Sequence, residues 1–279
     1  MKSGEIKRQT ADGQIIVNHS YEIDQFMRRV TLPREVSSDN YLAFLGCSFA
    51  FGFGVRDEET IPSQIQKNLM KIKVYNYGVS GAGPIDVLFR LKSIEPAELP
   101  EKKGVFLYFF FKDQMKRLFH HPEFVANSDG MNVVYSKDAK GEWTFTGFYK
   151  FINPYRTWFY QKFIHSSFYR LVAPVLSQPA YEEEDWRQLV DVILAMKKEV
   201  VRLNGKFVFV IWPYIELDSK LVEILRENQV DVLDYSHLDI FKLTNQKVYI
   251  PGDGHPTPAA AAVMGKQIAA DLPSVISLP

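Results

Sequence analysis

The chain has 279 residues, of which 46% are hydrophobic and 14% aromatic, a composition typical of a globular domain large enough to bury a continuous core. Its 33 basic and 33 acidic residues cancel and no basic stripe runs along the sequence, so a nucleic-acid partner is not expected. A single cysteine, Cys47, excludes an intrachain disulfide and a metal site built on several thiolates.

The amino-terminal stretch from Met1 to Thr10 is polar and lacks the apolar core of a secretory signal peptide. No apolar run approaches the roughly 18 residues of a membrane-spanning helix. We therefore expect no membrane span in this chain, a cytoplasmic location by default, and a periplasmic one if a leader has been removed. The composition leaves the oligomeric state open, and no cofactor or metal ion is implied.

Residues 1–40 are polar and irregular, and we expect an N-terminal arm or a short hairpin against one domain of residues 41–279. Five short apolar runs without strict alternation then predict strands that are covered on both faces. These runs are Tyr41–Gly46, Val74–Tyr77, Val105–Phe111, Phe207–Trp212 and Val230–Tyr235. Helices are predicted between and after them, at Pro62–Lys71, Ile85–Ser93, Glu182–Leu203, Leu217–Asn228 and Pro258–Ala270.

Strands that alternate with helices predict an α/β fold, a three-layer α/β/α sandwich around a parallel sheet of about five strands. In such sheets ligands bind at the carboxyl ends of the strands. The alternation breaks between about residues 115 and 180, where Val133–Tyr135 and Trp143–Thr146 predict a hairpin and residues 145–169 are rich in aromatic side chains. This aromatic-rich insertion is interpreted as a subdomain with its own small core or as a lid over the ligand site, and the two are compatible.

The first predicted strand runs directly into Gly46-Cys47-Ser48. Glycine before the serine allows a sharp turn, so that the Ser48 hydroxyl and its N–H group can face the ligand cleft. Alone, this motif is explained equally well by a glycine-rich turn whose serine bonds to the backbone. A dinucleotide site is not expected, because the glycines at 46, 52 and 54 do not form the G-x-G-x-x-G pattern.

Asp253 and His255 lie in a loop of glycines and prolines directly before the last predicted helix. An aspartate two residues from a histidine can accept from the imidazole Nδ1–H, which leaves Nε2 free to take a proton from a serine. A histidine at such a junction can also be a local cap, but the carboxylate and the prolines favour catalysis. The remaining histidines lack such a neighbour and are expected to be structural or exposed: His19, His120, His121, His165 and His237.

A third glycine-rich stretch, which ends in Ser80-Gly81, follows the second predicted strand. Small residues there expose backbone N–H groups toward the cleft, and acyl transfer needs such donors to stabilise a tetrahedral oxyanion. Read alone, this stretch is an ordinary loop between a strand and a helix.

Together the three stretches resemble the SGNH/GDSL hydrolase family, from Tyr41 to about Asp271. Gly46-Cys47-Ser48 is similar to the Gly-Asp-Ser block, with Cys47 in place of aspartate. The resemblance implies a flavodoxin-like fold, a Ser48–His255–Asp253 triad, and an oxyanion donor at Gly81. The family more often places Asp and His three residues apart, and the Asp-x-His spacing found here occurs in acetyltransferase-like relatives.

The third family block departs from the pattern, because Lys112 stands where the family has an oxyanion-binding asparagine. Three interpretations stay open: Lys112 or Gln114 replaces that donor, the Ser48 and Gly81 amides suffice, or catalysis is lost. The expected function is a serine esterase that acts on small acyl esters, acetyl on carbohydrate being the first candidate. The alternatives are a polysaccharide O-acetyltransferase and a non-catalytic glycan-binding protein with the same fold.

Overall fold

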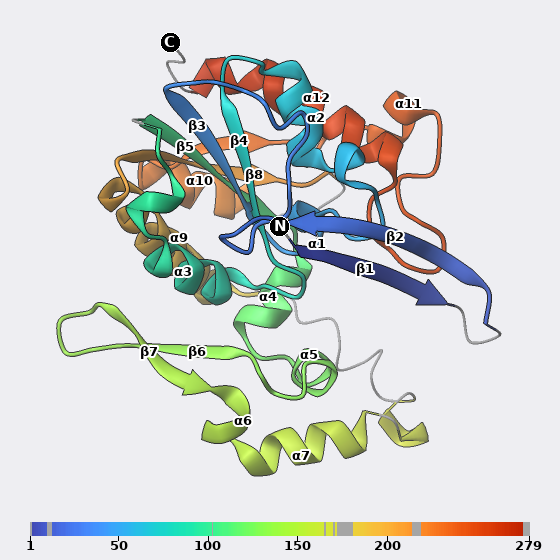
Figure 1. Ribbon diagram of the computed structural model, residues 1–279. Helices are drawn as coiled ribbons and strands as arrows, with labels where there is room; N and C mark the ends of the chain where they lie inside the picture. Colours follow the sequence, from blue (N-terminus) through green and yellow to red (C-terminus); the bar gives the residue numbers. More distant parts are fainter. Residues whose placement is uncertain are drawn as a thin grey trace.

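The computed structural model describes residues 2–9, 13–101, 103–164, 166–169, 171, 181–213 and 219–275. A parallel five-stranded sheet, ordered β4-β3-β5-β8-β9, forms the centre of the molecule (Figure 1). All five predicted strands are present, with small shifts at their ends. Their bounds are β3 (Asn40–Gly46), β4 (Lys73–Gly78), β5 (Lys103–Phe110), β8 (Gly205–Ile211) and β9 (Asp231–Asp234).

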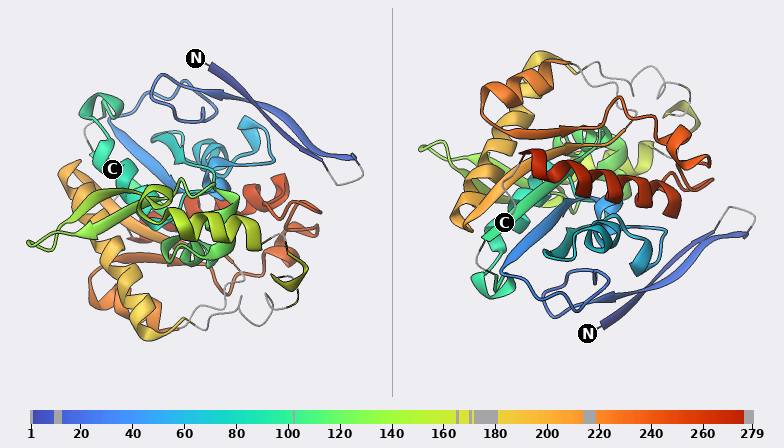
Figure 2. Two further views of the ribbon diagram at one scale, coloured as in Figure 1. Left: turned by 90° about the horizontal axis from the view of Figure 1, so that it is seen from below. Right: turned by 90° about the horizontal axis from the view of Figure 1, so that it is seen from above.

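Helices cover both faces of this sheet, which gives the predicted three-layer α/β/α sandwich (Figures 1 and 2). The chain runs from β3 to its neighbour β4 at one edge of the sheet, and then returns past β3 to β5, β8 and β9 in order toward the other edge. Because crossovers between parallel strands are right-handed, helices that connect strands in opposite directions across the sheet lie on opposite faces. One layer contains α2 (Ile61–Asn68) and α12 (Pro258–Val275), which pack on each other. The other contains α3 (Pro84–Ser93), α9 (Glu183–Arg202) and α10 (Ser219–Glu227).

The helix boundaries follow local signals in the sequence. Thr60 Oγ1 accepts a hydrogen bond from the Ser63 N–H at 3.2 Å and caps α2. Thr257 Oγ1 accepts from the Ala260 N–H at 3.3 Å and caps α12, which continues past the predicted end at Ala270. The predicted start of α10 at Leu217 lies outside the described residues.

Two smaller units accompany the sandwich. The first is an antiparallel hairpin of β1 (Lys2–Gln9) and β2 (Ile15–Ile23), which lies at one side of the carboxyl ends of the central strands (Figure 1). The second follows β5 and forms the lower lobe in Figure 1. It comprises α4 (Asp113–Leu118), α5 (Pro122–Asn127), a β6 (Val133–Lys137) to β7 (Trp143–Phe148) hairpin, α6 (Tyr149–Ile152) and α7 (Pro154–Phe163).

The core is built from the strands and the facing sides of the helices. Phe44, Phe106 and Phe209, from three adjacent central strands, are completely buried. Sheets covered on both faces need such continuous apolar strands, which is the pattern that the sequence displays. Among the described helices, none is long and apolar enough to cross a bilayer.

Candidate active site

Ser48 lies at the carboxyl end of β3, at the first residue of a short helix, α1 (Ser48–Phe51). The turn into this helix depends on Gly46, whose φ of +147° disfavours any residue with a side chain. A Cβ at Gly46 would also lie 2.9 Å from the Phe109 carbonyl oxygen. The Ser48 residue is only 6% exposed, yet its hydroxyl is directed to the loop that precedes α12.

That loop brings His255 and Asp253 to Ser48. His255 Nε2 lies 2.8 Å from Ser48 Oγ, and His255 Nδ1 lies 2.6 Å from Asp253 Oδ2. The loop is closed on itself, because the Ile250 N–H donates to the His255 carbonyl at 2.8 Å and the Asp253 N–H donates to the Ile250 carbonyl at 3.1 Å. The three side chains thus form one continuous chain of hydrogen bonds across more than two hundred residues of sequence.

The surroundings of His255 are apolar. The Phe53 ring centre lies 4.6 Å from that of the imidazole, and the Phe49 ring centre lies 5.6 Å from it. Burial lowers the pKa of His255, and this effect outweighs the opposing effect of the Asp253 carboxylate. The positive charges of Arg8 and Arg117 lower the pKa further. A lowered pKa favours the neutral imidazole, which is the form that can accept a proton.

The loop after β4 lies beside the serine turn, because the Val79 N–H donates to the Gly46 carbonyl at 3.0 Å. Gly81 is exposed in this loop with a φ of +82°, and no described residue accepts from its N–H group. Arg117 fixes the loop by donating to the Ala82 carbonyl at 2.6 Å. The Ser48 N–H, at the start of α1, likewise has no acceptor within its helix.

Asp86 holds the far end of the same loop by accepting from the Gly83 N–H at 2.7 Å. Burial raises the pKa of Asp86 to about 6, although the Gly83 N–H and Arg117 act in the opposite direction. The Val133 backbone, at the start of β6, also bonds to this carboxylate. Asp86 therefore connects the glycine-rich loop to the inserted lobe.

The two residues proposed from the sequence as substitute oxyanion donors differ in their surroundings. Lys112 directly precedes α4, is exposed, and its ammonium group bonds to no described residue. Gln114 is completely buried, donates from Nε2 to the Phe109 carbonyl at 3.0 Å, and accepts from the Tyr108 hydroxyl. The interpretation of Gln114 as a donor is therefore wrong, because both ends of its amide already bond inside the core.

The other histidines do not join this cluster. His120 stacks on Tyr149 with ring centres 4.8 Å apart, and burial lowers the pKa of His120. His19, His121 and His237 make no hydrogen bond or ring contact with Ser48, Asp253 or His255, and His165 lies outside the described residues. Within the described part of the chain, no group of three or more His, Cys, Asp or Glu side chains is placed to hold a metal ion.

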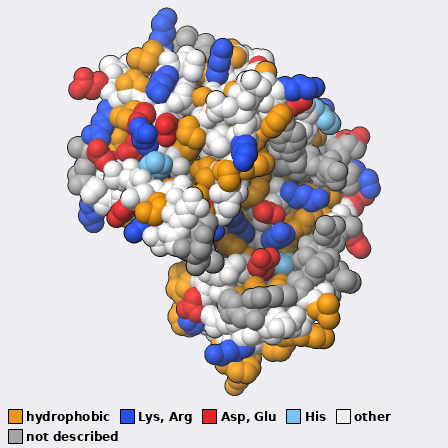
Figure 3. Space-filling view, turned by 90° about the vertical axis from the view of Figure 1, so that its right-hand side faces the viewer, with side chains coloured by type: hydrophobic (Ala, Val, Ile, Leu, Met, Phe, Trp, Pro, Cys, Tyr) orange, Lys and Arg blue, Asp and Glu red, His pale blue; other side chains and the backbone are white. Residues whose placement is uncertain are grey.

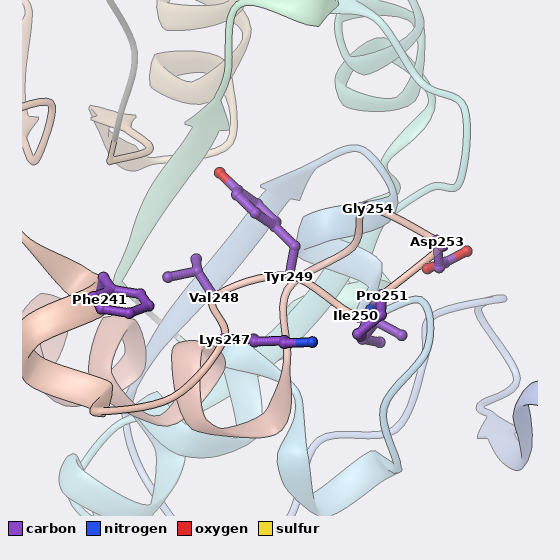
Figure 4. Close-up of a pocket in the computed structure, with 9 residues that line it drawn as sticks. Phe241, Lys247, Val248, Tyr249, Ile250, Pro251, Asp253 and Gly254 are labelled. Atoms are coloured by element: carbon purple, nitrogen blue, oxygen red, sulfur yellow. The ribbon is translucent and has the colours of Figure 1, made fainter.

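A cavity of about 760 Å³ opens on the outer side of the loop that carries Asp253 (Figure 4). It is lined by Phe241, from α11 (Ile240–Thr244), and by the stretch from Lys247 to Gly254. Ser48 and His255 do not line it, and Figure 4 shows the Asp253 carboxylate directed away from Phe241. The cavity is therefore adjacent to the Ser48–His255–Asp253 cluster but separate from the serine itself.

Comparison with known proteins gives matches among solved structures. No protein-family model and no curated protein matches the chain. A lipolytic protein of the G-D-S-L family from Veillonella parvula is 9% identical, with 85% of this chain and 100% of that chain covered and a TM-score of 0.47. The esterase EstA from Pseudoalteromonas sp. is 13% identical, with 84% and 97% covered and a TM-score of 0.47. An acetyl-xylooligosaccharide esterase from Geobacillus is 12% identical, with 85% and 94% covered and a TM-score of 0.46. The first of these is named as a member of the G-D-S-L family, the family that the sequence motifs resemble.

Arg29 supports the site and was not predicted from the sequence. Its guanidinium is buried, pairs with Asp57 Oδ1 at 2.7 Å, and donates to the carbonyls of Gly52 at 2.6 Å and Val55 at 2.7 Å. These carbonyls belong to the loop that leaves α1, and Phe51 contributes a third at 3.2 Å. One buried side chain therefore fixes the segment directly after Ser48.

Arg8 is the second residue that sequence reasoning missed. It lies on β1, and its Nε is 3.2 Å from Asp253 Oδ1, although the two are not aligned for a hydrogen bond. Val17 and Ile16 of β2 border Gly54 and Gly252, in the loops that follow Ser48 and precede Asp253. The N-terminal hairpin therefore packs on both loops of the site. No sequence signal marks this contact, because it depends on how the hairpin docks.

Proposed function

We propose that this chain is a serine esterase of the SGNH type that cleaves small acyl esters. Ser48 is the nucleophile, His255 the general base, and Asp253 the residue that orients the imidazole. The observation that carries the proposal is the continuous contact from Ser48 Oγ through His255 to Asp253, at 2.8 and 2.6 Å. The lowered pKa of His255 supports it, because a general base must be unprotonated at the working pH.

In the proposed mechanism, His255 Nε2 takes the Ser48 proton while Oγ attacks the ester carbonyl carbon. The N–H groups of Ser48 and Gly81 stabilise the oxyanion, with the Lys112 ammonium as a further donor. The tetrahedral intermediate then collapses, and the alcohol leaves with the proton from His255. Water, activated by the same imidazole, attacks the acyl-serine, releases the acid and restores the hydroxyl.

The substrate proposed first is an acetyl ester, carried on carbohydrate. Support comes from the family resemblance of the motifs. A second candidate, transfer of the acyl group to a sugar hydroxyl, is favoured by one observation. Asp253 and His255 are two residues apart, the spacing that occurs in acetyltransferase-like relatives of the family that the motifs resemble.

The test is labelling with a serine-directed fluorophosphonate, followed by intact mass measurement. The wild type should take one adduct, and Ser48→Ala and His255→Ala should take none. Ser93→Ala and His237→Ala are matched controls at exposed positions outside the site and should label like the wild type. A folded wild-type protein that takes no adduct would contradict the proposal and favour the glycan-binding alternative. Release of acetate with and without oligosaccharide acceptors then separates hydrolysis from transfer.

A further inference from the structure

The outer surface of α6 and α7 is apolar and uncovered. Its exposed side chains are Phe151, Ile152, Tyr155, Trp158 and Phe159, which we call the aromatic face. Tyr155 is 88% exposed, Phe151 70% and Trp158 60%. Figure 3 shows hydrophobic side chains gathered at the lower end of the molecule, the end that α6 and α7 occupy in Figure 1. Helices of globular proteins normally bury their apolar residues, but α7 buries only Thr157. An uncovered apolar surface of this kind marks an interaction site.

The charged residues of the segment that carries the aromatic face are of one sign. The sequence from Tyr149 to Leu171 contains four basic residues and no Asp or Glu, in a chain whose total charge is zero. Arg156 and Lys162, both on α7, are exposed and pair with no carboxylate of the described residues. Lys150 is neutralised by Asp129, a carboxylate from outside this stretch that also accepts from Gln161 of α7, so Arg156 and Lys162 carry the unpaired charge. The surface therefore combines exposed Trp, Tyr and Phe with unneutralised positive charge.

We propose that the aromatic face docks on the surface of an anionic lipid bilayer. Trp and Tyr prefer the boundary between headgroups and acyl chains, and Lys and Arg beside them attract lipid phosphates. The α7 helix has ten residues, so it lies in the interface and does not span the bilayer. The proposal is independent of any catalytic role of Ser48.

Two other occupants fit the surface less well. A second copy of the chain, in a two-fold dimer, would place the same positive charges of both copies against each other. A sugar platform needs several hydrogen-bonding groups beside its rings, but of the five side chains in the aromatic face only Tyr155 and Trp158 have a polar atom, and the stretch has no carboxylate. Only the lipid surface uses both the apolar rings and the positive charge.

The tryptophans provide a direct readout. Trp186 and Trp212 are buried, Trp143 is partly buried, and Trp158 is the one in the aromatic face. Addition of phosphatidylcholine vesicles that contain phosphatidylglycerol should shift the emission to the blue and protect it from acrylamide. Trp158→Phe keeps an apolar ring, so this variant should still co-sediment with the vesicles but lose the emission change.

Variants separate the two contributions. Tyr155→Ala with Phe159→Ala should weaken binding roughly tenfold, because apolar area is lost from the interface. Arg156→Glu with Lys162→Glu should weaken it by one to two orders of magnitude on phosphatidylglycerol vesicles, at about fivefold or more per basic residue. Lys71→Glu with Lys266→Glu makes the same change in charge elsewhere on the surface and should bind like the wild type.

Three results would overturn the proposal. The first is absence of co-sedimentation of the folded wild type with phosphatidylglycerol vesicles. The second is binding that the aromatic and charge variants leave unchanged. The third is a dimer in sedimentation equilibrium that the aromatic variant dissociates while vesicles bind neither protein, which would assign the face to a second copy. Because none of these measurements uses enzyme activity, failure here and failure of the proposed esterase activity are distinguishable.

Discussion

Removal of the Arg29 side chain should destabilise the protein strongly and loosen the segment after Ser48. Arg29→Ala breaks the ion pair with Asp57 and the hydrogen bonds to the Gly52 and Val55 carbonyls. The Arg29 side chain is buried, so water cannot easily replace these bonds. Loss of one partner of a buried ion pair costs about 3–5 kcal/mol. At about 2–4 °C per kcal/mol for a domain of this size, the melting temperature should fall by roughly 10 °C.

Thermal unfolding followed by circular dichroism measures this effect. Arg56→Ala is the matched control. The Arg56 side chain is 62% exposed, and its guanidinium lies 3.8 Å from the Glu58 carboxylate, too far for a hydrogen bond. Its removal should therefore cost less than about 0.5 kcal/mol. Arg29→Ala combined with Asp57→Ala should cost less than the sum of the two single changes, since each leaves the other charge unpaired. A melting temperature of Arg29→Ala within about 2 °C of the wild type would refute the reasoning.

Three further predictions concern the site. Because burial lowers the pKa of His255, the rate of fluorophosphonate labelling should rise with pH through a midpoint below 6.5 and be flat above it, and a midpoint above 6.5 would contradict this. Arg8→Gln removes a positive charge that lowers the pKa of His255, so the same profile should move to higher pH; an unchanged profile would show that Arg8 does not act on the imidazole. In Gly81→Ala the added Cβ has room, but the φ of +82° at this position is unfavourable for alanine. The backbone should shift, so labelling should slow by about ten- to a hundredfold, while the free energy of unfolding falls by only about 1–2 kcal/mol. Equal labelling of wild type and Gly81→Ala would remove Gly81 from the proposed oxyanion site.

The sheet could be predicted because its signals are local. Each central strand is a short apolar run bounded by polar or glycine-rich sequence. Thr60 and Thr257 directly precede the first residues of α2 and α12 and cap these helices. The contact between Ser48 and the Asp253–His255 pair was implied by the resemblance of the three motifs to one family. The topology is consistent with it, since a loop after β3 and a loop before the last helix both open on the carboxyl ends of the strands.

The supporting residues could not be predicted, because their partners are distant in sequence. Nothing in the spacing of Arg29 and Asp57 links them across 28 positions, and only the docked arm brings them together. Gln114 stayed open as a substitute donor for a related reason: the sequence places it after a strand end, but does not show that it lies inside the core against Tyr108. The exposed state of the aromatic face was equally hidden, since a run of aromatic residues predicts burial as readily as exposure.

The central claim is that Ser48 is an activated nucleophile. Its most direct test is reaction of the protein with p-nitrophenyl acetate, rapid acid quench, and peptide mapping by mass spectrometry. The account predicts an acetyl group on Ser48 that is removed by hydroxylamine and is absent from Ser48→Ala and His255→Ala. Acetylation confined to another residue, such as Lys112, or equal acetylation of Ser48 in wild type and His255→Ala, would contradict it.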